Sequence, residues 1–203
     1  MTLQRFDIDG LTASPWKNGG GVTREIASYP AGAGMNDFLW RLSIATVAMD
    51  GPFSIFPGVD RIITLLEGPG MRLVSEDGGI DHRFDQPLDP YAFPGEEIVQ
   101  GIVLGGASSD FNVMTRRRDM RAFVGVERRP HTTANAAHGL LLAVAGGWRV
   151  RDEHGGQDHA LEPRQGLWWA DEPHAWTLMP GSPDDRLLAV RILYTTTQLE
   201  SAP

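Results

Sequence analysis

The chain has 203 residues, with 26 acidic against 18 basic side chains, and a net charge of −8. This acidic balance argues against a nucleic-acid-binding surface, and the absence of cysteine excludes disulfides and thiolate metal sites. Arg5, Asp7 and Asp9 near the start exclude a signal peptide, and no apolar run is long enough to span a membrane. We therefore expect a cytoplasmic protein without nucleic-acid or membrane partners.

The spacing of glycine and proline predicts an all-β chain. The 24 glycines and 14 prolines are spread along the sequence and separate short runs of alternating apolar residues, whereas segments with helical periodicity are scarce. Residues 3–8 read as the first short strand. The next element, residues 15–26, combines three consecutive glycines with several polar side chains.

In that element, Gly19 to Gly21 give the backbone freedom to turn, with Lys17 and Asn18 just before them. A strand begins at Val22, and with period 2 Arg24 shares a face with Val22 and Ile26. An arginine on an apolar strand face lies beneath an acidic group or points into a cavity. The alternative is a surface hairpin whose arginine snorkels to water.

Three later segments also read as strands with distinct faces. In residues 40–49, Arg41 and Ser43 oppose an apolar face. Arg61 opens the strand at residues 61–67. In residues 110–117, one face carries the side chains of Asp110, Asn112, Met114 and Arg116.

A repeat relates two parts of the chain. A shift of 77 residues aligns Ile63–Phe84 with Leu140–Leu161 without a gap, and eight of the 22 pairs are identical. Both copies read as strand, glycine, strand, Gly-Gly turn and an Asp-His pair that opens the next strand. We interpret this as a duplicated β-unit.

The block Pro15-Trp16-Lys17-Asn18-Gly19-Gly20-Gly21, followed by Thr23-Arg24-Glu25-Ile26, resembles the opening signature of the HutD/Ves family. Residues 110–117 resemble a second signature block. The resemblance covers most of the chain and implies a cupin-like architecture and an association with bacterial histidine utilisation. Together with the repeat, it predicts a bicupin of two jelly-roll-type β-barrels, residues 1–122 and 123–203, with exchange of strands between the barrels left open.

The sequence lacks the metal-ligand pattern of cupins. Residues 55–61, where the first histidine pair would fall, contain no histidine, and none of the six histidines forms a pair two residues apart. His174 alone stands where a late cupin histidine would fall, and one ligand cannot hold a metal. We expect no metal, no cofactor and no identifiable catalytic residue.

Without a metal, the barrel interior has to bind its ligand with side chains. Guanidinium groups bind carboxylates through bidentate forks, so a mouth rich in arginine, lysine and asparagine suits a small carboxylate. The alternative is that Arg24 and Arg61 form structural salt bridges with Glu25, Glu67 or Asp110. The predicted ligand-binding residues are Lys17, Asn18, Thr23, Arg24, Arg61, Asp110, Asn112, Met114 and Arg116.

Three functions fit these features. The first is a regulator or sensor of histidine utilisation that binds a small carboxylate such as formate, urocanate or an N-formyl amino acid. The second is a metal-independent isomerase or hydrolase that acts on a similar acid. The third is a protein interaction module that uses the tryptophans of the second barrel, Trp148, Trp168, Trp169 and Trp176. These tryptophans also leave homodimer formation open.

Overall fold

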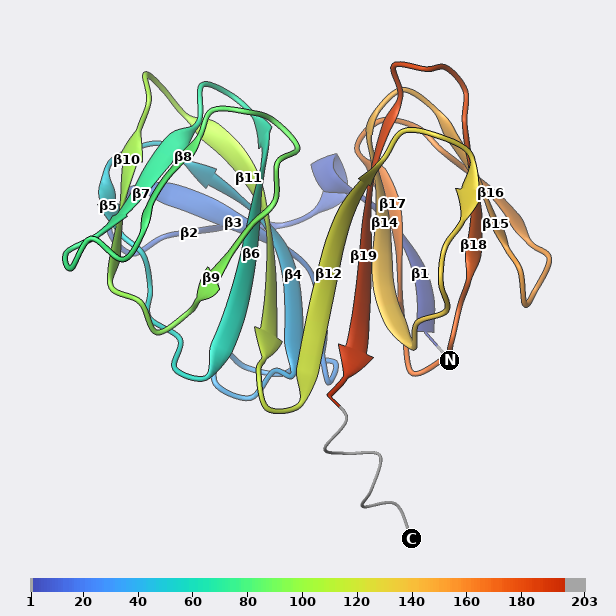
Figure 1. Cartoon of the computed structure of the whole chain (residues 1–203), viewed down its shortest axis with the longest axis horizontal. Helices are drawn as coiled ribbons and strands as arrows, with labels where there is room; N and C mark the ends of the chain where they lie inside the picture. The colour runs from blue at the N-terminus through green and yellow to red at the C-terminus, as the bar shows by residue number, and fades with distance from the viewer. Residues whose placement is uncertain (1, 196–203) are drawn as a thin grey trace, which may run out of the picture. The chain divides into compact units, whose positions relative to one another are not determined.

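The computed structural model describes residues 2–195 and contains nineteen β-strands (Figure 1). Within these residues the helical content is limited to one 3₁₀ turn, η1 (Ile8–Gly10), so the all-β prediction is confirmed. In this part of the chain no helix has the length and apolar character needed to cross a membrane. The chain divides into a first unit, residues 12–120, and a second unit, residues 2–11 with 121–194.

The first unit contains two antiparallel sheets. The six-stranded sheet has the order β2-β3-β4-β11-β6-β9, and the four-stranded sheet has the order β5-β10-β7-β8. An apolar cluster that includes Ile63, Leu65, Leu73 and Phe84 joins residues of both sheets, because alternate side chains of each strand point to one face. The strands of the larger sheet are β2 (Ala13–Pro15), β3 (Gly21–Tyr29), β4 (Trp40–Val47), β6 (Val59–Glu67), β9 (Tyr91–Pro94) and β11 (Ser108–Arg116). Those of the smaller sheet are β5 (Gly51–Pro52), β7 (Met71–Ser75), β8 (Asp81–Phe84) and β10 (Val99–Val103).

The second unit also contains two sheets, in the orders β1-β17-β14-β19-β12 and β13-β18-β15-β16. Its core contains Trp148, Trp169 and Trp176, each at most 2% exposed. These three tryptophans therefore stabilise the unit from inside and are not available as an interaction surface. The strands of the larger sheet are β1 (Thr2–Asp7), β12 (Met120–Glu127), β14 (His138–Ala145), β17 (Gln165–Ala170) and β19 (Arg186–Tyr194). Those of the smaller sheet are β13 (His131–Thr132), β15 (Trp148–Asp152), β16 (Asp158–Leu161) and β18 (Trp176–Pro180).

Strand β1 belongs to the second unit, although the expected division grouped residues 1–122 together. It pairs with β17 along its whole length, from Thr2 opposite Ala170 to Asp7 opposite Gln165. The backbone N–H of Ile8 then donates to the carbonyl of Arg164 at 3.0 Å. The alternation in residues 3–8 identified a strand, but the strand's partner lies more than 150 residues away and leaves no local signal.

The two repeated segments occupy matching places in their units. Met71–Ser75 (β7) and Asp81–Phe84 (β8) shift by 77 residues onto Trp148–Asp152 (β15) and Asp158–Leu161 (β16). Each copy forms an antiparallel hairpin at the edge of its four-stranded sheet, with β8 and β16 as the edge strands. The repeat in the sequence thus corresponds to one repeated hairpin topology.

Gly70, in the turn before β7, is a position where we expect alanine to be strongly destabilising. Its φ is +92°, and an added Cβ would overlap the carbonyl oxygen of Phe84, which is backbone and cannot rotate away. Gly78 has a similar φ of +74° but open space around it, so Gly78→Ala is a matched control for the backbone strain. We expect Gly70→Ala to cost about 2 kcal/mol more than Gly78→Ala, measured by urea unfolding. Equal losses in the two variants would contradict this account.

Candidate functional site

Strand register brings the polar residues of three central strands of the first unit onto one face. Met114 of β11 lies opposite both Arg41 of β4 and Arg61 of β6. Two residues along β11, Asn112 lies opposite Ser43, and two further along, Asp110 lies opposite Ala45. Directly opposed residues share a sheet face, so these side chains form three successive rows.

These rows form one wall of a cavity of about 710 Å³ that lies wholly within the first unit. Such a volume is in the range of small-molecule sites. The cavity combines apolar and aromatic side chains with a small number of polar groups. Its lining residues are Pro15, Trp16, Lys17, Asn18, Thr23, Met35, Arg41, Ser43, Ala45, Val47, Pro52, Phe53, Ser54, Phe56, Arg61, Asp110, Asn112 and Met114.

Arg61 is the buried cation of this cavity. It is 5% exposed, and its Nε has no hydrogen-bond partner among residues 2–195. The guanidinium carbon lies 5.3, 5.7 and 5.2 Å from the ring centroids of Phe53, Phe56 and Phe93. These cation–π contacts offset part of the cost of burying the charge. Burial lowers the pKa of Arg61 to about 10, opposed by Asp110 and reinforced by Arg41, so Arg61 remains charged at neutral pH.

Asp110 is the buried carboxyl of the same cavity. It is 2% exposed, and its Oδ1 has no hydrogen-bond partner in the described part of the chain. Burial raises the pKa of Asp110 to about 7, although the positive charge of Arg61 acts in the opposite direction. Asn112, between the Asp110 and Met114 rows, is 7% exposed, and its Oδ1 is likewise unpartnered among residues 2–195.

The glycine-rich turn presents Lys17 and Asn18 to the cavity. Asn18 Oδ1 accepts a hydrogen bond from the N–H of Gly20 at 3.0 Å, and Trp16 Nε1 donates to Thr23 Oγ1 at 2.8 Å. A Cβ at Gly21 would overlap the carbonyl oxygen of Thr46 on the adjacent strand, so this glycine permits close packing of β3 against β4. The expectation that this turn contributes to the same cavity as Arg61 agrees with the lining residues.

Arg24 is a correction to the predicted site. In the register of β3, Thr23 lies opposite Ala45, which lines the cavity, whereas Arg24 lies opposite Ile44 on the other face. That other face is also buried, with Ile44 only 2% exposed. The apolar neighbours of Arg24 therefore marked a covered face of the sheet, but not the face that lines the cavity.

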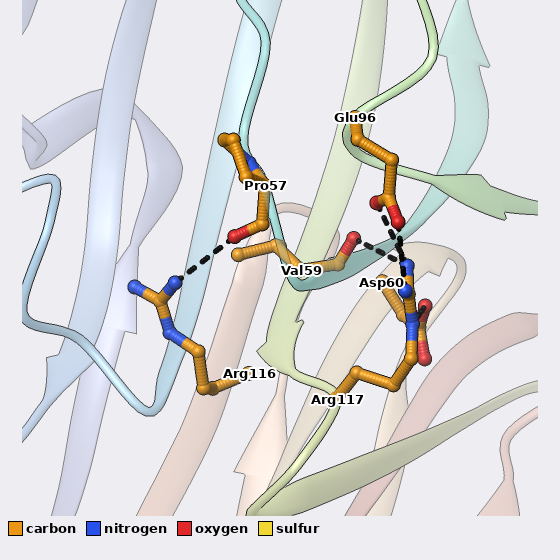
Figure 2. A network of polar contacts seen from close by, with 6 residues as sticks. All are labelled: Pro57, Val59, Asp60, Glu96, Arg116 and Arg117. Carbon is orange, nitrogen blue, oxygen red and sulfur yellow. Dashed lines mark hydrogen bonds and ion pairs between the residues drawn. The ribbon is translucent and has the colours of Figure 1, made fainter.

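Arg116 is the second correction. It lies at the end of β11, outside the cavity lining, and its guanidinium donates to the carbonyls of Pro57 at 3.2 Å and Asn36 at 2.8 Å. Figure 2 shows Arg116 with Pro57, next to a separate network in which Arg117 contacts Asp60, Glu96 and Val59. Both arginines hold loops against the end of the sheet, which is the structural salt-bridge and hydrogen-bond role that local spacing cannot distinguish from ligand binding.

Seven of the nine predicted residues do line the cavity, and several further lining residues were not predicted. Arg41 is the most informative of these, since its Nε lies 2.6 Å from Glu25 Oε2 and its own row contains Arg61. The alternation of Arg41 and Ser43 against an apolar face was the available signal. Phe53 and Phe56 come from a loop whose fold no periodicity indicates. The predicted residues in the lining are Lys17, Asn18, Thr23, Arg61, Asp110, Asn112 and Met114.

The cavity lining offers one carboxylate, Asp110, and no imidazole. Across residues 2–195, no group of three or more His, Cys, Asp or Glu side chains gathers in a way that could hold a metal ion. In the second unit, His174 is 6% exposed, its Nδ1 lies 3.2 Å from Asp152 Oδ1, and its ring stacks on Trp176 at 5.6 Å. His174 is thus a packed histidine.

Comparisons with known proteins agree with the sequence signature. The family model described as HutD matches residues 9–184. Protein Ves of Cronobacter sakazakii (strain ATCC BAA-894) is 38% identical over 178 residues, which covers 87% of this chain and 92% of that protein. The structure of HutD from Pseudomonas fluorescens SBW25 in a formate condition superposes with a TM-score of 0.81 at 27% identity and covers 96% and 100% of the two chains. A conserved protein of unknown function from Pseudomonas aeruginosa PAO1 gives a TM-score of 0.84 at 33% identity, with 95% and 100% covered.

A more distant likeness concerns the fold alone. A cupin 2 conserved barrel domain protein from Leptotrichia buccalis superposes with a TM-score of 0.60 at 9% identity, over 95% of this chain and 96% of that one. The architecture is therefore cupin-like.

Proposed function

Since the chain belongs to the HutD family, we propose that the first unit binds a small carboxylate and that the protein acts as a sensor or regulator in histidine utilisation. The observation that carries the proposal is Arg61, a charged group that is 5% exposed in a cavity and whose Nε has no partner among the described residues. The family's association with bacterial histidine utilisation supports the biological role.

A carboxylate ligand would complete the surroundings of Arg61. Burying a charge without full hydrogen bonding is unfavourable, and the three phenylalanine rings compensate only through cation–π attraction. A guanidinium donates most strongly to a carboxylate, in two parallel hydrogen bonds. The formate condition of the Pseudomonas fluorescens HutD structure supports a small carboxylate as the ligand class.

Lys17 and Arg41 add to the preference for an anion. Both line the cavity, and Arg41 is held in place by its ion pair with Glu25 at 2.6 Å. Asp110 is the one acidic side chain in the lining, and burial holds its pKa near 7. The cavity therefore has a net positive character, which favours anions over neutral molecules of the same shape.

A thermal-shift screen tests the proposal with matched pairs. Each acid, among them formate, urocanate and an N-formyl amino acid, is compared with its uncharged amide at the same concentration. We expect at least one acid to raise the melting temperature, because a ligand at about 100 times its Kd stabilises the folded state by about 2.7 kcal/mol, and its amide to have no effect. Equal effects of acids and amides, or no effect of any acid, would contradict the proposal.

A metal-independent enzyme is the second candidate, and Asp110 favours it. A carboxyl with a pKa near 7 inside a cavity has the properties of a general acid or base. An isomerase or hydrolase of a small carboxylic acid would use Asp110 for proton transfer while Arg61 holds the substrate. Incubation of the protein with the acids from the screen, followed by NMR, distinguishes turnover from binding.

We also propose that the two units arose from one duplicated cupin-like barrel. The matching bounds of the hairpins β7–β8 and β15–β16, 77 residues apart, support this origin. Residues 140–161 of the second unit keep the Gly-Gly turn, whereas the lining residues of the cavity belong to the first unit. Homodimer formation stays a prediction.

A further inference from the structure

Asp110 and Asn112 are the two unexplained acceptors of the cavity. Each is more than nine-tenths buried, and the Oδ1 atom of each lacks a hydrogen-bond partner among residues 2–195. The direct neighbours of Asp110 across the sheet are Ala45 and Leu65, whose side chains cannot donate. Binding of a carboxylate to Arg61 would leave both acceptors as they are.

The two acceptors and Arg61 occupy different parts of the cavity wall. Arg61 lies in the Met114 row, Asn112 in the middle row and Asp110 in the third. Four residues of β-strand separate Asp110 from Met114, a Cα distance of roughly 13 Å that the long arginine side chain shortens. A ligand that reaches from Arg61 to Asp110 therefore carries two functional groups, one at each end.

We propose that Asp110, assisted by Asn112, is a specificity-determining residue that accepts a hydrogen bond from an N–H or O–H group carried by the ligand in addition to its carboxylate. This inference rests on the proposed function of the same cavity and narrows its ligand class. An acid with an apolar or ester end leaves a buried carboxyl oxygen without a donor, and such a mismatch is strongly disfavoured in a site built to form the bond.

The inference also predicts opposite pH dependences for two kinds of acid. A ligand that donates to Asp110 favours the ionised carboxylate, so its affinity rises as the pH increases towards about 7, the pKa of Asp110 raised by burial. A donor-free acid adds negative charge near Asp110 and favours the protonated form, so its affinity falls above that pH. The other charged groups at the cavity are Arg61, Arg41 with its partner Glu25, and Lys17; side chains of these types ordinarily titrate outside pH 6–8.

N-acetylglycine and acetoxyacetate form a matched pair of probes, because they differ only in an amide N–H against an ester oxygen. Titration of each into the full chain, followed by NMR, gives both affinities at pH 6 and pH 8. We expect wild type to bind N-acetylglycine about 10- to 150-fold more tightly, the range for a hydrogen bond to a charged group. In Asp110→Ala the preference should fall to within about threefold, whereas Ser109→Ala, on the opposite face of β11, should retain it.

Asp110→Asn is the second variant, for use if the alanine variant does not fold. It keeps an acceptor but no charge, so it should retain a reduced preference and lose its pH dependence. Equal binding of the two probes by wild type, or an undiminished preference in Asp110→Ala, overturns the inference and leaves the carboxylate site standing. Failure of both probes and of every acid in the screen overturns the proposed function together with this inference.

Discussion

Replacing Arg61 by methionine is expected to weaken carboxylate binding by about 10- to 150-fold, which corresponds to loss of a charge-assisted interaction of about 1.5–3 kcal/mol. Methionine retains an unbranched chain that can pack against Phe53, Phe56 and Phe93, so the cavity wall is preserved while the charge is removed. Arg61→Lys should also weaken binding, because an ammonium group cannot form the two parallel hydrogen bonds of a guanidinium. Calorimetric titration with the acid that gives the largest thermal shift measures both effects.

Arg24→Ala is the matched control for this experiment. Arg24 is an arginine of the same sheet, but it lies opposite Ile44 on the face away from the cavity. Its removal should change the affinity by less than about twofold, since it makes no cavity contact. If Arg24→Ala weakens binding as much as Arg61→Met does, or if neither variant has an effect while both remain folded, the assignment of the site to Arg61 is wrong.

The second large effect is expected on stability, from Asp110→Asn. The pKa of Asp110 is about 7 in the folded protein, raised by burial from an ordinary value of 3.8. An acid with a raised folded pKa binds its proton more tightly when folded, so its favourable contribution is complete below about pH 4. That contribution is lost as the pH rises to about 7. Wild type should therefore become less stable relative to Asp110→Asn across this window.

The difference should level off above pH 7 at about 2–4 kcal/mol in favour of the variant, the upper value being the full shift at 1.36 kcal/mol per unit. Urea unfolding of both proteins at pH 4.5 and pH 8 measures it. Asp89→Asn removes the same charge from an exposed position and should show no such window. A constant difference between wild type and Asp110→Asn at the two pH values would mean that Asp110 is not the buried, titrating group described above.

The sequence predicted the chemistry of the cavity better than its geometry. Asp110, Asn112 and Met114 were assigned to one strand face by period 2, and all three line the cavity. Period 2 also separated the faces of β3 correctly, yet the face chosen for Arg24 was the wrong one. Both faces of this sheet are buried, so apolar neighbours did not reveal which one borders a cavity.

The aromatic surroundings of Arg61 had no detectable signal. Phe53 and Phe56 lie in a loop, and Phe93 lies on β9, which pairs with β6 in a register that places it opposite Arg61. Arg116 illustrates the opposite error. It continues the polar face of residues 110–116 in sequence, but at the end of the strand the nearest acceptors are the loop carbonyls of Pro57 and Asn36.

By itself the sequence determined the class of fold, the family and the repeat, because alternation, glycine turns and a long signature are local properties of the chain. The tertiary structure alone decided which strands pair, and therefore which residues meet. It placed β1 beside β17, Arg41 in the row of Arg61, and Arg24 away from the cavity. Strand pairing joins residues far apart in sequence through backbone hydrogen bonds that nearly every residue type can form, so no local pattern specifies the partner.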